Sequence, residues 1–318
     1  MKSVVFALAL VASFAASAQG YPNRPIKVVV PYAAGGLPDT MARLVGQKMG
    51  DSLGQQFVVE NRPGAGGIVG TTDVARAAPD GYTLLVADVS QIAINPHLFS
   101  KLPYDPLKDL TGVSMMGTSA LYLVAHSSVP AASMKELVAL IKAEPGKISY
   151  GSSGLGSIHH LAMEALKVGL KLDMLHVPYK GTGQSVPALL GGQVPLLYAA
   201  LPSIESHVKA GKVKILAVST PQRSQQTPEV PTVAESGVPG YDFVAEIGFY
   251  APVGAPQEVI AKLAGEAQKA VKHPEVAQRF KQLGIEPVGS TPEAYNAANR
   301  ASYQKYEKVV KASGAKID

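Results

Sequence analysis

Short apolar segments alternate with amphipathic, helix-like segments along the chain, and turns rich in glycine or proline separate them. Residues 26–30 form a run typical of a strand, and apolar residues recur at helical spacing over residues 39–50. Helical crossovers of this kind connect parallel strands, so the alternation predicts a parallel sheet covered by helices. The elements expected in this part are strands at 26–30, 57–60 and 82–87, and helices at 39–50 and up to residue 77.

A second α/β unit is expected from about residue 121. Its strands are expected at 121–125, 148–150, 174–177, 194–198 and 213–219, and its helices at 133–143, 158–168 and 186–190. A strand at 245–251 and helices at 257–272, 274–283 and 292–313 follow. Because the chain crosses between the units near residues 121 and 244, we expect two α/β lobes joined by a double connection. The first expected lobe is 19–121 with 244–318, and the second is 122–243.

The first 18 residues have the three regions of a secretory signal peptide. Lys2 supplies the positive charge, residues 4–14 carry no charge and are apolar apart from Ser13, and Ala16-Ser17-Ala18 is a small-residue cleavage site. The alternative is a buried N-terminal helix, but such a helix would not require all three of these regions. We therefore expect cleavage after Ala18 and export of the mature chain to a bacterial periplasm.

The amino-acid composition excludes several classes of function. The chain has no cysteine, which excludes a disulfide framework, a thiolate nucleophile and a lipid-anchored N-terminal cysteine. Removal of the signal peptide leaves 28 basic and 24 acidic side chains, a net charge of +4. The basic residues form no run and are not interleaved with aromatic residues, so nucleic acid is not an expected partner.

The sequence does not have the residue spacing of the known metal-binding and cofactor-binding motifs. The seven histidines are scattered and form no H-E-x-x-H motif, so no metal site is expected. Gly64-x-Gly66 is followed by Val69 where a dinucleotide fingerprint requires glycine. Lys180 precedes the neighbouring glycines, which is the reverse of the P-loop order. We expect no cofactor.

The turn PYAAGGLPDT at residues 31–40 connects the first strand to the first helix. Ligands of open α/β sheets bind at the carboxyl ends of strands, so this turn is a candidate site. Gly35-Gly36 allow backbone N–H groups to converge at a helix N-terminus, which favours an anion. The alternative is a tight turn in which Asp39 is the N-cap of the helix.

The loop Gly151-Ser152-Ser153-Gly154-Leu155-Gly156-Ser157 lies between an expected strand and an expected helix. One hypothesis is a serine nucleophile assisted by His159 or His160; the other is a neutral hydrogen-bonding cradle. The nucleophile-elbow pattern G-x-S-x-G is absent from the sequence. Adjacent histidines on a helix point in different directions, so at most one of the two should face the loop.

The combination of these stretches resembles the solute receptors of tripartite tricarboxylate transporters, the Bug family of periplasmic binding proteins. The matching stretches follow the family's order across the mature chain. They are Tyr21-Pro22 and residues 31–43, 58–70, 79–85, 102–110, 145–157, 176–183, 189–194, 210–220 and 230–241.

The resemblance implies a type II periplasmic binding protein fold, with two α/β lobes joined by a double-strand hinge. It implies a ligand-binding receptor for a small organic mono-, di- or tricarboxylate, and no catalytic residue. The carboxylate would lie between the two loops described above. The ligand-binding residues implied, with one from the loop 88–95, are Tyr32, Gly35, Gly36, Asp39, Ser90, Ser152, Ser153, Gly156, Ser157, Tyr179 and Thr182.

The sequence departs from the family pattern at Leu37-Pro38 and Tyr32, and it has no tryptophan. Together with Phe249, these residues suggest a more apolar pocket that suits an aromatic or longer-chain acid. The implied partners are an inner-membrane permease or a sensor protein, and the chain is expected to be a monomer. Two alternatives remain open: a secreted serine hydrolase using Ser153 or Ser157 with His160, and a ligand-sensing subunit of a sensor kinase.

Overall fold

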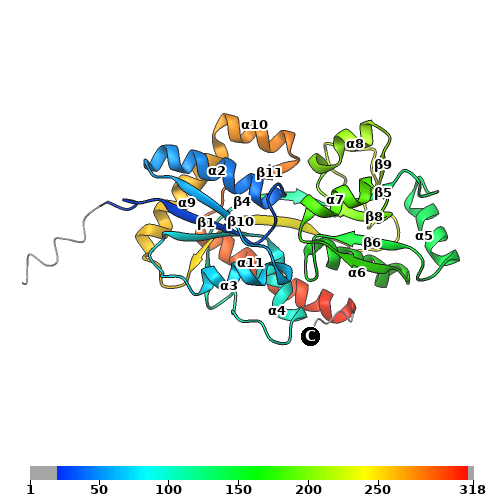
Figure 1. The fold of residues 1–318 in the computed structure, drawn as a ribbon, viewed down its shortest axis with the longest axis horizontal. Helices are drawn as coiled ribbons and strands as arrows, with labels where there is room; N and C mark the ends of the chain where they lie inside the picture. Colours follow the sequence, from blue (N-terminus) through cyan, green and yellow to red (C-terminus); the bar gives the residue numbers. More distant parts are fainter. Residues whose placement is uncertain (1–19, 314–318) are drawn as a thin grey trace, which may run out of the picture.

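Two β-sheets organise the computed structural model, which describes residues 20–313 (Figure 1). The six-stranded sheet has the order β11 (Ile285–Pro287), β4 (Leu110–Ala120), β10 (Val244–Pro252), β3 (Thr83–Ala87), β1 (Ile26–Val30) and β2 (Phe57–Asn61). The five-stranded sheet has the order β7 (Leu175–Pro178), β6 (Ser149–Ser152), β8 (Leu196–Ala199), β5 (Tyr122–His126) and β9 (Val213–Val218). Each sheet and its helices form one α/β lobe.

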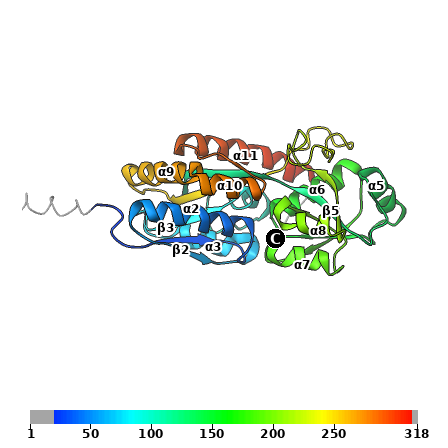
Figure 2. The ribbon, with the colours of Figure 1, turned by 90° about the horizontal axis from the view of Figure 1, so that it is seen from above.

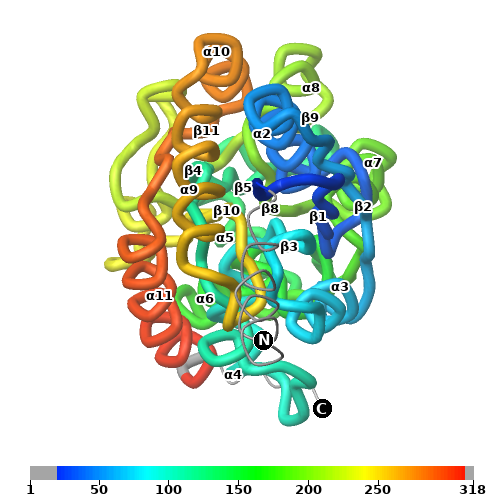
Figure 3. The backbone as a smooth tube through the Cα atoms, turned by 90° about the vertical axis from the view of Figure 1, so that its left-hand side faces the viewer, coloured from blue at the N-terminus to red at the C-terminus, as the bar shows by residue number. Residues whose placement is uncertain are grey.

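Helices cover both faces of each sheet. In the first lobe, α2 (Leu37–Leu53), α9 (Gln257–Lys272) and α10 (Pro274–Gln282) lie on one face, and α3 (Ile68–Ala75) and α11 (Pro292–Ser313) lie on the other (Figure 3). In the second lobe, α5 (Met134–Ala143) and α6 (Ile158–Leu170) lie opposite α7 (Thr182–Leu190) and α8 (Glu205–Lys209). Helix α11 extends from the first lobe to α6 of the second (Figure 2).

The strands are only partly parallel. β1 is parallel to β2 and β3, and β6 is parallel to β7 and β8, as the alternation of strands and helices predicts. β10 is antiparallel to both β3 and β4, and β5 is antiparallel to β8 and β9. The parallel sheet expected for residues 26–87 is confirmed, and the antiparallel pairs are those that include β5 or β10, the strands that directly follow the two crossings between the lobes, or the short strand β11.

The longest strand of the first lobe, β4, was not expected from the sequence. Its residues LTGVSMMGTSA contain glycine, serine and threonine and lack a continuous apolar run. Pairing with β10 along its length and with β11 at its end buries it. A Cβ atom on Gly117 would lie 2.7 Å from the carbonyl oxygen of Glu286, so close strand packing explains that glycine.

The N-cap of helix α2 lies three residues before the predicted N-cap, Asp39. Gly36 is its N-cap, and Pro38 lies in the first turn, where a missing N–H costs nothing. The prediction of Asp39 as N-cap is thus wrong: Asp39 lies inside the first turn. Met41, Val45 and Met49 face the core, and the helix ends at Gly54 in the left-handed conformation.

Two other helix boundaries also differ from expectation. α7 begins at Thr182, four residues before the expected start at 186, and α3 ends at Ala75 rather than at residue 77. The π-helical turn η3 (Ser90–Ile94) and the short helix α4 (Asn95–Leu98) were not expected. The earlier start of α7 matters for function, since it places Thr182 at a helix N-terminus.

The two crossings between the lobes lie side by side. β4 and β5 are separated only by Leu121, and Phe243 precedes β10. Ser219 bonds to both: its Oγ accepts from the Leu121 N–H at 3.0 Å and donates to the Phe243 carbonyl at 2.5 Å. Its backbone bonds to the same two residues. The crossings are therefore held together by one buried serine.

The predicted signal peptide, residues 1–18, lies outside the described residues. Within residues 20–313, no helix combines the length and the apolar character that crossing a membrane requires.

Candidate functional site

Three helix N-termini meet at a small cavity between the lobes. Among the residues that line it, Gly36 and Pro38 lie at the start of α2, His159 lies at the start of α6, and Thr182 is the first residue of α7. The cavity has a volume of about 20 Å³, and its lining consists of Tyr32, Ala33, Gly36, Pro38, Asp88, Ser153, His159 and Thr182. Helix N-termini carry a partial positive charge and unpaired N–H groups, so they favour a negatively charged group here.

The lobes touch closely around this cavity. A Cβ atom on Gly36 would lie 3.3 Å from the Oγ1 atom of Thr182, and one on Gly66 would lie 2.4 Å from the Leu155 carbonyl oxygen. The first N–H of α6, on Ile158, donates to Ser90 Oγ at 2.9 Å. The structure is therefore a closed form of the two lobes.

Tyr32 and Asp88 form the first-lobe wall. The Tyr32 hydroxyl donates to Asp88 Oδ2 at 2.9 Å and accepts from Gln91 Nε2 at 2.9 Å. The Ser90 N–H donates to Asp88 Oδ1 at 2.7 Å. Burial raises the pKa of Asp88, against the opposing effect of these donors. The Tyr32 proton is therefore committed to Asp88, so Tyr32, which the resemblance implied as a ligand-binding residue, has no hydroxyl proton left to donate to a ligand.

Ser153 and His159 form the second-lobe wall, with Ser153 Oγ 2.8 Å from His159 Nδ1. Burial lowers the pKa of His159 to about 4, so the imidazole is neutral at pH 7. Among the described residues, no carboxylate hydrogen-bonds to His159. The pair therefore has the first contact of a serine–histidine dyad but lacks the acidic residue that usually orients the histidine.

His160 has a different role from the one the hydrolase alternative assigned to it. Its Nδ1 accepts from the Gly156 N–H at 3.4 Å, and its ring stacks on His176 at 4.1 Å. The expectation that at most one of the two histidines faces the loop is wrong, because the loop wraps around the N-terminus of α6 and contacts both. His160 bonds to Ser157 only through the helix cap.

The base of the serine loop is a buried polar cluster. Ser152 Oγ lies 2.6 Å from His176 Nε2 and accepts from the Gly154 N–H at 3.1 Å. Ser157 is the N-cap of α6, and its Oγ accepts from the His160 N–H at 3.2 Å. Neither serine lines the cavity. They shape the loop that presents Ser153.

Gly35 and Asp39 shape the first-lobe turn in the same way. Asp39 Oδ2 accepts from the Gly35 N–H at 3.0 Å, and the carboxylate also accepts from Arg43 and Asn61. These hydrogen bonds lower the pKa of Asp39, although burial alone would raise it. Gly35 has φ of +85°, which favours glycine. Neither residue lines the cavity.

An open groove of about 340 Å³ continues from the cavity, because Tyr32 and Ser153 line both. Its walls come from the glycine-rich loop after β2, the serine loop and the loop after β7. Pro31, Phe99, Leu155, Pro178 and Tyr179 give it much apolar surface, and Lys180 adds one charge. Leu37 and Phe249, which the sequence suggested for an apolar pocket, line neither space.

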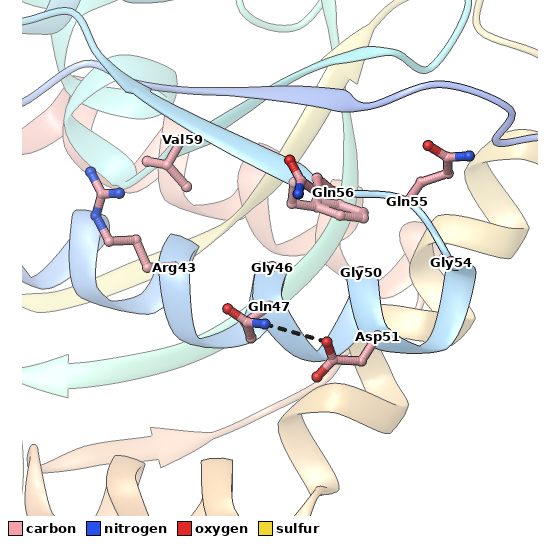
Figure 4. A pocket seen from close by; sticks show the side chains of 10 residues that line it. Arg43, Gly46, Gln47, Gly50, Asp51, Gly54, Gln55, Gln56 and Val59 are labelled. Atoms are coloured by element: carbon pink, nitrogen blue, oxygen red, sulfur yellow. Dashed lines mark hydrogen bonds between the residues drawn. The ribbon is translucent and has the colours of Figure 1, made fainter.

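A larger groove, of about 530 Å³, lies on the outer side of the first lobe between α2 and the edge strand β2 (Figure 4). Gly46 and Gly50 allow the helix to approach the strand, since a Cβ atom on Gly50 would lie 2.8 Å from the Gln55 carbonyl oxygen. None of the predicted site residues lines this groove. The site predicted from the sequence thus corresponds to the cavity between the lobes and not to this surface groove.

Of the predicted residues, the structure brings Tyr32, Gly36, Ser153 and Thr182 together in the cavity and places Tyr179 in the adjoining groove. Gly35, Asp39, Ser90, Ser152, Gly156 and Ser157 support the loops or the contact between the lobes. The sequence analysis missed Asp88 and His159 as residues that line this cavity. A carboxylate directly after the strand 83–87, at its carboxyl end, was the available signal for Asp88.

Metal binding has no support in the part of the chain that the structure describes. No group of three or more His, Cys, Asp or Glu side chains is arranged there to hold an ion.

Comparison with known proteins decides the family. The profile of the tripartite tricarboxylate transporter family receptor matches residues 41–315. The chain belongs to this family. It is 39% identical over 306 residues to the protein BugT of Bordetella pertussis, covering 95% of this chain and 93% of BugT. Proteins of this family are periplasmic substrate-binding receptors.

Solved structures show the same fold. A Rhodopseudomonas palustris protein with adipate is 31% identical, with a TM-score of 0.90 over 94% of this chain and 100% of that one. MatC of Rhodopseudomonas palustris with bound malate is 33% identical, with a TM-score of 0.87 over 91% of this chain and 100% of that one. This receptor chain therefore has the two-lobed fold of periplasmic binding proteins, as the resemblance implied.

Proposed function

We propose that this receptor captures a small organic carboxylate between its lobes and delivers it to an inner-membrane permease of the tripartite tricarboxylate type. The observation that carries the proposal is the meeting of three helix N-termini at one small cavity. Among the described residues, neither lysine nor arginine lines this cavity. Backbone N–H groups, the Ser153 and Thr182 hydroxyls and ordered water would then hold the carboxylate.

The groove beside the cavity supports a ligand larger than its carboxylate group. The volume of about 20 Å³ suits about one water-sized group, whereas the adjoining groove offers about 340 Å³. The carboxylate would face the helix N-termini, and an aliphatic or aromatic remainder would extend along Leu155 and Tyr179. The relatives solved with adipate and malate support a carboxylate as the ligand class.

The proposed lobes are residues 19–121 with 244–318, and 122–243, moving about the crossings at Leu121 and Phe243. Closure would then be a hinge motion whose closed population rises with ligand. We further propose cleavage of the signal peptide after Ala18 and a monomeric mature protein. A sensor protein is the second candidate partner, because it would recognise the same closed pair of lobes.

A thermal-shift screen of the mature chain against mono-, di- and tricarboxylates tests the proposal. A ligand at 100 times its Kd stabilises the folded state by about 2.7 kcal/mol, a readily measured shift in Tm. Ser153→Ala should reduce the shift, since a hydrogen bond to a charged group contributes about 1.5–3 kcal/mol. Ser100→Ala, at an exposed serine outside the site, is the matched control. A chain whose Tm responds to no carboxylate would contradict the proposal.

Ester hydrolysis is the alternative function to be tested, because Ser153 contacts His159. Turnover of small esters that Ser153→Ala abolishes would favour it. The absence of an orienting carboxylate at His159 among the described residues favours the receptor.

A further inference from the structure

Asp88 is a buried carboxylate that lines the ligand cavity without a cationic partner. Its exposed fraction is 5%, and no Lys, Arg or His side chain among the described residues pairs with it. Buried charges in proteins are normally paired, because leaving water is costly for an ion. The missing counter-charge must therefore come from outside the chain, or the carboxylate must remain protonated.

The protein satisfies only part of the acceptor capacity of Asp88. An ionised carboxylate offers about four acceptor sites. The Ser90 N–H donates to Oδ1, the Tyr32 hydroxyl donates to Oδ2, and the Ser90 hydroxyl also hydrogen-bonds to the carboxylate. The Tyr32 oxygen is itself engaged by Gln91 Nε2, which orients the Tyr32 proton toward Asp88. The first-lobe wall thus presents acceptors to the cavity and no hydroxyl proton.

The opposite side of the same cavity presents donors. The starts of α2, α6 and α7 meet there, and they favour a negatively charged group. One small cavity therefore has an anion-attracting side and a cation-attracting side. A dicarboxylate would bring a second negative charge toward Asp88, which like-charge repulsion disfavours.

We propose that the ligand carries an ammonium group on a carbon near its carboxylate, as in an amino acid, and that Asp88 binds this ammonium. This inference rests on the proposed function, and it narrows the ligand class of the same site. The carboxylate lies at the helix N-termini, and the ammonium donates to the remaining acceptor capacity of Asp88. The described form leaves only about 20 Å³ there, so the lobes close less tightly around a ligand whose carboxylate and ammonium both enter the cavity. The rest of the ligand extends into the groove along Phe99, Leu155 and Tyr179.

Calorimetric titration with pairs of acids that differ by one ammonium group tests the proposal. The probes are L-phenylalanine with 3-phenylpropionate, L-leucine with 4-methylpentanoate, and L-aspartate with succinate. For at least one pair, the wild-type chain should bind the amino acid at least tenfold more tightly. Asp88→Asn should remove or reverse this ratio, because the amide offers donors and releases the Tyr32 proton to the cavity.

Two control variants separate the charge from its surroundings. Asp51→Asn makes the same chemical change on the surface of α2, outside the cavity, and should leave the ratio unchanged. Tyr32→Phe removes a donor to Asp88 but retains the carboxylate, so the preference for the ammonium should persist. Circular dichroism and Tm establish whether each variant folds. Where a variant does not fold, the ratio of the two affinities in the wild-type chain, amino acid against des-amino acid, still tests the proposal.

The outcomes distinguish this inference from the function on which it rests. Tight binding of des-amino acids or dicarboxylates, with no preference for an ammonium, would overturn the role of Asp88 and leave the receptor function intact. An Asp88→Asn variant with an unchanged ratio would do the same. No binding of any carboxylate, with or without an ammonium, would overturn both.

Discussion

At the residue scale, burial of the Asp88 carboxylate lowers the stability of the folded protein, and the same carboxylate is the proposed binding group for the ligand's ammonium. Burial raises its pKa, and the Ser90 and Tyr32 donors oppose that shift only in part. The folded state therefore holds a proton at pH values where the unfolded chain has released it, so the free energy of unfolding falls as pH rises through this interval. The cost of ionising Asp88 in the folded state is therefore greater at pH 7 than at pH 4. Glu246 is close enough for the charge of Asp88 to raise its pKa as well.

Asp88→Asn should accordingly raise the Tm of the ligand-free protein at pH 7. A gain of roughly 1 kcal/mol would appear as about 2–4 °C for a chain of this size. The gain should shrink toward pH 4, where the wild-type carboxyl becomes protonated. Differential scanning calorimetry at the two pH values measures this, with Asp51→Asn as control. An equal or lower Tm at pH 7 would show that Asp88 has a counter-charge within the protein.

The buried histidines should make the protein sensitive to acid. Burial lowers the pKa of His159 to about 4 and, with the charges of His160 and Lys167, the pKa of His176 to about 3. An unfolded histidine titrates near pH 6.5. Between that pH and the folded pKa values, the unfolded chain binds more protons, so the free energy of unfolding falls as the pH drops below about 6.5.

Replacing His176 with glutamine should flatten this pH dependence, since the variant retains a polar group for Ser152 but no longer titrates. Urea unfolding at pH 7 and pH 4.5 measures the difference in the free energy of unfolding for each protein. His207→Gln, on helix α8 outside the buried histidine cluster, is the control. A difference as large in His176→Gln as in the wild type would assign the acid sensitivity elsewhere.

At the element scale, the connection between the lobes depends on Ser219. This residue is fully buried and bonds to both crossings through its backbone and its hydroxyl. The hydroxyl is the only group among the described residues that both accepts from the Leu121 N–H and donates to the Phe243 carbonyl. Removing it leaves two buried backbone groups unpaired.

Ser219→Ala should destabilise the protein by about 1–3 kcal/mol, the cost of an unsatisfied buried polar group. Amide hydrogen exchange should also accelerate at Leu121, because its N–H loses its acceptor. Chemical denaturation and exchange mass spectrometry measure the two effects, and Ser100→Ala is the exposed control. Unchanged exchange at Leu121 would mean that another group ties the crossings.

The elements themselves were largely predictable from local patterns. The strand at residues 26–30 and the C-terminal helix at 292–313 have the predicted bounds, because strand-like and helical periodicities are strong there. β4 was not predictable in this way. Its stability comes from non-local pairing with β10 and β11, and such pairing overrides weak local propensity.

At the scale of the whole molecule, closure brings Gly36 of α2 against Thr182 of α7. A Cβ atom on Gly36 would lie 3.3 Å from Thr182 Oγ1, while the Gly36 φ of −75° tolerates any residue. Threonine is also an acceptable N-cap, so Gly36→Thr adds bulk at the contact between the lobes with little local strain.

Gly36→Thr should therefore shift the protein toward an open form and weaken ligand binding at least tenfold. Small-angle X-ray scattering should show a larger radius of gyration than in the wild type, and calorimetry should show the weaker affinity. Gly265→Thr, on α9 where a Cβ atom meets nothing, is the control for the same substitution. Equal radii and equal affinities would mean that closure does not require this approach.

The sequence alone determined the α/β class, the family and the two loops that form the site. Local periodicity encodes helices and strands, and glycine and serine at the carboxyl ends of strands mark turns that can bind an anion. It also placed Tyr32, Gly36, Ser153 and Thr182 among the candidates, and these four residues meet in the cavity.

Only the tertiary structure decided what each side chain is free to do. Tyr32 and Asp88 are 56 residues apart, and their hydrogen bond commits the Tyr32 proton within the protein. Among residues 20–313, the same fold leaves Asp88 without a counter-charge and makes Ser153 a partner of His159 rather than of His160. Hydrogen-bond capacity is finite, so the groups left for a ligand depend on contacts between distant segments, which local sequence patterns do not encode.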